Sequence, residues 1–199
     1  MQHSFFGEYK PFDIDKRIPK RRILIYLNVY NNQFALQYFN RLKKFVRQTV
    51  VLDIKDTPPH PDDAITLASD SLETNEYDEC WVVVDRELSF NFQQVLEKSK
   101  EANVNVIYCN LSFELWVLLH FRNVDKNERL DRNSIWQELK RLSKSERHQI
   151  LDHMLDENNM AVAIKRAELL YREQGGSGAW KNNPSTNFFE IIESIVNLP

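Results

Sequence analysis

Trp-Val-Val-Val-Asp-Arg-Glu, at residues 81–87, is the stretch of this 199-residue chain that indicates the fold most clearly. Its four consecutive apolar residues are typical of a strand buried on both faces, as in a parallel sheet covered by helices. Asp85 and Glu87 follow where that strand should leave the core. Ligands of open α/β sheets bind at the carboxyl ends of the strands, so both carboxylates are candidate site residues.

The spacing of Asp85 and Glu87 suggests a chemical role. Residues i and i+2 of an extended chain point to the same side, so these carboxylates could share one divalent cation. An acidic loop that merely follows a core strand would have the same sequence. The spacing alone leaves both interpretations open.

Strand and helix patterns alternate through the first half of the chain. Short apolar or β-branched runs predict strands at residues 23–27, 50–54, 81–84 and 104–108. The segments between them have helical periodicity, so we expect a mainly parallel, four-stranded sheet with helices on both faces. After residue 112 the patterns are helical, and we expect them to form a C-terminal helical cap. The predicted parts are a basic arm at 1–22, an α/β core at 23–121 and a helical region at 122–199.

The overall composition restricts the possible environments. Hydrophobic residues make up 42% of the chain, which is enough for a substantial core, and the net charge of −3 gives no global sign of nucleic-acid binding. Cys80 and Cys109 lack metal-ligand spacing, as expected in a reducing compartment. Residues 1–11 are mostly polar and lack an apolar core, and no segment reaches bilayer-spanning length, so we expect a cytoplasmic protein without a membrane partner.

Basic residues are nevertheless concentrated in two places. One group precedes the first strand and the other follows the first helix, and together they are candidates for a positive surface near the carboxylates. A solvated N-terminal arm would explain the first group equally well. The candidate phosphate-binding residues are Lys20, Arg21, Arg22, Lys43 and Lys44, supported by Lys16, Arg17, Arg41 and Arg47.

Residues 110–121 read Asn-Leu-Ser-Phe-Glu-Leu-Trp-Val-Leu-Leu-His-Phe and predict a buried helix with Ser112 as its N-cap. Glu114 is costly in such a segment unless it has a partner or a metal. A carboxylate at a helix start is also favoured by the helix dipole, so Glu114 suits either a structural or a site role. We expect His120 to be a hydrogen-bonded core histidine rather than a ligand.

These segments, with Asn-Pro-Ser-Thr-Asn at residues 183–187 before a last helix, resemble the RloB-like family of bacterial defence proteins. The resemblance spans roughly residues 20 to 197. It implies a TOPRIM-like fold and a nuclease-type subunit that works with a partner ATPase. We expect residues 183–187 themselves to form a turn and helix cap.

A TOPRIM-type site combines a glutamate after the first strand with an Asp-x-Asp pair after a later one. Asp85 matches the first aspartate of the pair, and Glu87 stands in the place of the second. The family usually has a Cys-Glu-Gly-type turn after the first strand. Here Asn28 is the nearest equivalent of that glutamate, and the glycine is missing.

Three hypotheses follow. The first is a metal-dependent nuclease-like subunit of an anti-phage system, with Mg²⁺ or Mn²⁺ on Asp85 and Glu87 and with Glu114 replacing the lost charge. The second is a catalytically degenerate TOPRIM-like binding or regulatory subunit. The third is an unrelated α/β domain that binds a small ligand at the strand ends.

Overall fold

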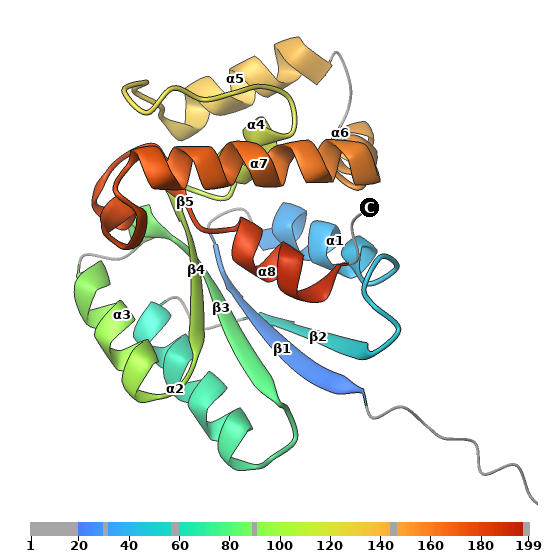
Figure 1. Ribbon diagram of the computed structural model, residues 1–199, viewed down its shortest axis with the longest axis vertical. Helices are drawn as coiled ribbons and strands as arrows, with labels where there is room; N and C mark the ends of the chain where they lie inside the picture. The colour runs from blue at the N-terminus through green and yellow to red at the C-terminus, as the bar shows by residue number, and fades with distance from the viewer. Residues whose placement is uncertain (1–19, 30–31, 57–59, 89–90, 144–146, 197–199) are drawn as a thin grey trace, which may run out of the picture.

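A five-stranded, mostly parallel sheet flanked by helices forms the centre of the computed structural model, which describes residues 20–29, 32–56, 60–88, 91–143 and 147–196 (Figure 1). The strand order is β2-β1-β3-β4-β5. The first four strands are parallel, and only β5 is antiparallel to its neighbour. The strands are β1 (Arg21–Asn28), β2 (Val50–Asp56), β3 (Glu79–Asp85), β4 (Asn105–Asn110) and β5 (Ser185–Thr186).

The helices follow the predicted pattern. Pro61 opens α2, where its fixed φ suits the first helical turn, and Asp156 caps α7 by accepting a hydrogen bond from the Asn159 backbone N–H at 3.0 Å. The helices are α1 (Asn32–Leu42), α2 (Pro61–Glu73), α3 (Phe92–Glu101), α4 (Glu114–Leu119), α5 (Arg132–Ser143), α6 (Arg147–Met154), α7 (Glu157–Glu173) and α8 (Phe189–Ile195), with short 3-10 helices η1 (Arg86–Leu88) and η2 (Gly176–Lys181).

The prediction of four strands was wrong by one, because part of the Asn-Pro-Ser-Thr-Asn segment is a strand. Thr186 pairs with Cys109 of β4, and the Asn187 side chain continues this pairing where the backbone ladder ends. Its Oδ1 accepts from the Tyr108 backbone N–H at 2.8 Å, and its Nδ2 donates to the Val106 carbonyl at 3.0 Å. The segment therefore closes one edge of the sheet as well as leading into α8.

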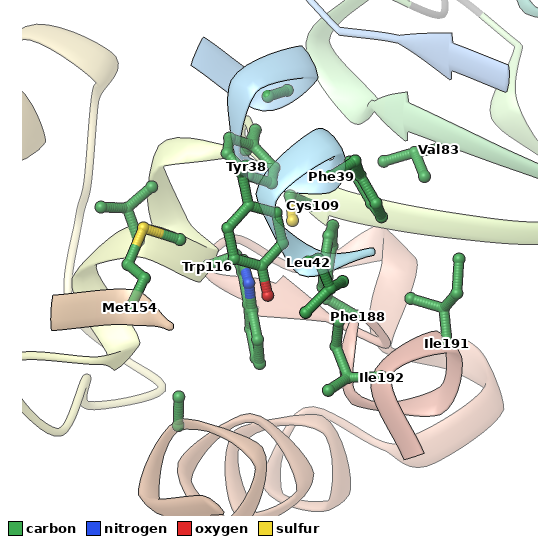
Figure 2. Packing of buried hydrophobic residues seen from close by; sticks show 14 of the residues in the cluster. Tyr38, Phe39, Leu42, Val83, Cys109, Trp116, Met154, Phe188, Ile191 and Ile192 are labelled. Atoms are coloured by element: carbon green, nitrogen blue, oxygen red, sulfur yellow. The ribbon is translucent and has the colours of Figure 1, made fainter. Parts of the chain in front are cut away.

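Two hydrophobic cores lie on the two faces of the sheet. The smaller one packs α2 and α3 against alternate residues of the central strands, such as Tyr26 and Val82. The larger one joins α1 and α4 to the C-terminal helices (Figure 2). Within it, the rings of Trp116 and Phe188 stack with centroids 4.8 Å apart. The C-terminal region therefore supplies part of the main core.

Two further expectations concern the basic N-terminal arm and the absence of membrane-spanning segments. Residues 1–19 of the predicted basic arm lie outside the described residues. Among the helices that the structure describes, none combines the length and the apolar character needed to cross a membrane.

Candidate functional site

Three neighbouring strands end in polar residues at the same edge of the sheet. Asn28, Asp85 and Asn110 are the last residues of β1, β3 and β4, and all three are buried. The register pairs Asn28 with Val84, directly before Asp85. Asn28 and Asp85 therefore share one rim, as their positions after parallel strands predicted.

Asp85 anchors the loop that leads into α4. Its Oδ1 accepts a hydrogen bond from the Phe113 backbone N–H at 2.7 Å, and its side chain is fully buried. Beyond Asp85 the chain turns into η1, so the expectation of an extended chain through Glu87 was wrong. The Glu87 side chain, 24% exposed, reaches the same cluster from this turn.

Arg132, the first residue of α5, contacts all three predicted acidic residues. Its Nη2 lies 3.7 Å from Asp85 Oδ2 and forms an ion pair with Glu87 Oε1. Its Nε lies 3.8 Å from Glu114 Oε2. The structure thus brings together Asp85, Glu87 and Glu114, as predicted, but around a guanidinium group that the sequence did not predict.

The position of Arg132 fits an ion pair, but no local signal in the sequence identified it. A cation at the start of a helix is opposed by the helix dipole, so it needs negative partners elsewhere. Arg132 opens α5, and its side chain is only 19% exposed. An arginine in such a position is a candidate for a buried ion pair, although the pattern does not name its partners.

Glu114 lies at the start of a helix and is buried, as the sequence predicted. It is the first residue of α4, where the helix dipole favours a carboxylate, and it is fully buried. Its Oε1 accepts a hydrogen bond from Trp136 Nε1 at 3.0 Å. Trp136 lies one turn after Arg132 on α5, so one face of α5 supplies two partners of Glu114.

The cluster has the oxygen ligands of a magnesium site but not the required arrangement. Three carboxylates and one guanidinium leave a formal charge of −2. Carboxylate oxygens are the ligands that Mg²⁺ prefers. In the parts of the chain that the structure describes, however, no group of three or more His, Cys, Asp or Glu residues is placed to hold a metal ion. With Arg132 between them, these side chains do not fit a shared cation.

Those of the predicted basic residues that the structure describes lie toward the opposite ends of the strands, so the expectation of a positive surface near the carboxylates was wrong for them. Lys20, Arg21 and Arg22 stand where β1 begins, whereas Asn28 stands where it ends. Helix α1 leads from the end of β1 back to β2, whose first residue, Val50, pairs with Arg21 at the start of β1. Lys43 and Lys44, which lie between α1 and β2, are therefore near the amino edge as well. Binding of nucleic acid by these residues stays a prediction.

Some of these basic side chains already have acidic partners. Arg21 forms an ion pair with Glu79 at 3.0 Å, and Arg22 lies 3.7 Å from both Asp53 and Glu76. Lys43 and Lys44 are exposed. The lysines are therefore the better candidates for contacts with a phosphate backbone.

His120 occupies the core position that the helical pattern predicted. It is buried, and its Nδ1 lies 2.8 Å from the Trp116 carbonyl oxygen. Burial lowers the pKa of His120 to about 3, so the imidazole is neutral near pH 7. These contacts are those of a structural histidine.

The fold and the rim define an α/β protein with a carboxylate cluster at the carboxyl edge of its sheet. A family model described as RloB-like protein matches residues 35–195, and the chain belongs to this RloB-like family. The searches of curated proteins and of solved structures found no significant match.

Proposed function

We propose that this chain is a catalytically degenerate, TOPRIM-like binding or regulatory subunit of a bacterial defence system. The contacts of Arg132 with Asp85, Glu87 and Glu114 carry this proposal. Defence, the TOPRIM relationship and an ATPase partner are implied by the resemblance to the RloB-like family.

Two features of the rim argue against phosphodiester chemistry. Metal-dependent cleavage needs several anionic ligands around Mg²⁺ and a base or metal-bound water to start the attack. Here the three carboxylates face a guanidinium group. Asn28, at the place of the family glutamate, is neutral and can neither bind a proton nor add negative charge.

The formal charge of the cluster favours a second candidate, a metal-dependent nuclease-like subunit that cleaves DNA or RNA. Asp85 and Glu114 are both fully buried, and Arg132 brings one positive charge to the three negative charges of the carboxylates. The formal charge of −2 on these four side chains has the same magnitude as the charge of one Mg²⁺ or Mn²⁺ ion and the opposite sign. Asp85 and Glu87 would be its ligands, after Arg132 had moved away.

The two candidates are separated by metal binding and by cleavage. Mn²⁺ and Mg²⁺ are titrated calorimetrically into the wild-type protein and into Asp85→Asn, whose amide oxygen can still accept from the Phe113 N–H. Nicking of DNA and cleavage of RNA are then measured with each metal, with and without the partner ATPase. We expect no metal binding that depends on Asp85 and no cleavage.

Protection against phage tests the same proposal in cells. We expect Asp85→Asn to protect bacteria as well as the wild-type protein does. Metal-dependent cleavage by the wild-type protein that disappears in Asp85→Asn would refute the degenerate assignment and establish the nuclease.

A further inference from the structure

The surroundings of Arg132 resemble those of a bound cation. Its guanidinium nitrogens face Asp85, Glu87 and Glu114, which come from three different elements. Two of these carboxylates are fully buried. Such carboxylates need a positive partner, because desolvation of an unpaired charge is very costly.

The position of α5 keeps Arg132 in the cluster. Trp136, on the same face of α5, donates its indole N–H to Glu114 Oε1 at 3.0 Å. Its ring also packs edge-on against Phe34 of α1, with centroids 5.6 Å apart. The helix is therefore attached to the rim by an apolar contact and a hydrogen bond that do not depend on the arginine charge.

We propose that Arg132 is a built-in cation that excludes divalent metals, and that neutralising it converts the cluster of Asp85, Glu87 and Glu114 into a Mn²⁺ site. This inference rests on the proposed degenerate function. Arg132 is then a positioning residue that keeps the three carboxylates in place without a metal.

The expected gain in Mn²⁺ affinity depends on the charge of the guanidinium and on the space that it occupies between the carboxylates. Arg132→Gln keeps a polar side chain of moderate length and changes the formal charge of the cluster from −2 to −3. It also removes the repulsion between the guanidinium and an incoming divalent ion a few ångströms away. With an effective dielectric constant of about 20, removing this repulsion should make Mn²⁺ bind at least about a hundredfold more tightly to Arg132→Gln than to the wild type.

The experiment measures Mn²⁺ binding to the full chain by the loss of the free-ion electron paramagnetic resonance signal. Wild type, Arg132→Gln and the double variant Arg132→Gln/Asp85→Asn are compared, with melting temperatures recorded in EDTA and in Mn²⁺. Arg166→Gln is the matched control. Arg166 is also partly buried on a helix, but it donates to two neutral groups, the Leu119 carbonyl and Asn123 Oδ1.

We expect tight Mn²⁺ binding and a Mn²⁺-dependent rise in melting temperature in Arg132→Gln only. Equal binding by wild type and Arg132→Gln, or a gain that persists in the double variant or appears in Arg166→Gln, overturns the inference. If Arg132→Gln is unfolded in EDTA, refolding by Mn²⁺ supports it, and failure to refold overturns it.

The Mn²⁺-binding test of Arg132 can fail while the proposed degenerate function stands. Metal-dependent cleavage by the wild-type chain would refute the degenerate function itself. An inactive wild type combined with an Arg132→Gln variant that binds no Mn²⁺ would refute only the role of Arg132.

Discussion

Replacing Asn187 with alanine should lower stability substantially, because the Asn187 side chain stands in for part of a strand. Its Oδ1 satisfies the buried Tyr108 N–H, and its Nδ2 donates to the Val106 carbonyl and to Glu190 Oε2 at 3.1 Å. Alanine removes all three hydrogen bonds and offers no replacement.

The size of the effect follows from these hydrogen bonds. Leaving the buried Tyr108 N–H without a partner costs about 1–3 kcal/mol, and removing the bond to Val106 costs roughly 1 kcal/mol more. We expect the free energy of unfolding to fall by about 2–4 kcal/mol. With a urea dependence of about 2 kcal/mol per M, the midpoint of urea unfolding should fall by about 1–2 M.

Equilibrium unfolding in urea, followed by circular dichroism, measures this change. Asn158→Ala is the control, because Asn158 is exposed on α7 and alanine is the better helix former. That variant should be unchanged or slightly more stable. If Asn187→Ala were destabilised by less than about 1 kcal/mol, the claim that this side chain closes the edge of the sheet would be wrong.

Three further predictions concern pH, salt and the core. His120 has an ordinary pKa of 6.5 in the unfolded chain and about 3 when folded, so stability should fall by up to about 1.4 kcal/mol per pH unit as pH drops from 6.5 toward 3. His120→Gln should flatten this dependence in urea titrations between pH 6 and pH 4, and an unchanged slope would contradict the assignment. If Lys43 and Lys44 bind DNA phosphates, Lys43→Ala/Lys44→Ala should lower the dependence of log affinity on log salt by about 0.9 for each phosphate that is no longer neutralised, whereas an identical salt dependence would exclude them. Phe188→Ala should cost about 3–5 kcal/mol in urea unfolding, because the ring stacks on Trp116 in the main core, and a cost below about 1 kcal/mol would mean that this ring contributes little to that core.

The strands and helices could be predicted because their signals are local. An apolar run such as residues 81–84 has few alternatives to a buried strand, and helical periodicity repeats within one turn. Asp85 could be placed at the carboxyl edge for the same reason. By contrast, β5 has two residues and no periodicity, so only its pairing with Cys109 and Asn110 of β4 makes it a strand.

The misplaced basic surface had a different cause. In a parallel sheet, residues before a strand and residues after it lie at opposite edges. Lys20 precedes β1 and Arg22 lies at its start, whereas Asn28 is its last residue. Strand direction alone would have placed these basic residues away from the carboxylates.

The α/β architecture, the family and the gathering of Asp85, Glu87 and Glu114 at one edge could all be inferred from the order of residues, since each depends on where a strand ends or a helix begins. The cation that contacts these carboxylates could not be inferred from the order of residues. Arg132 lies far along the chain, and it reaches the cluster because α5 packs over the carboxyl edge. Contacts between distant elements depend on how whole surfaces fit together, and no local pattern of residues specifies that fit.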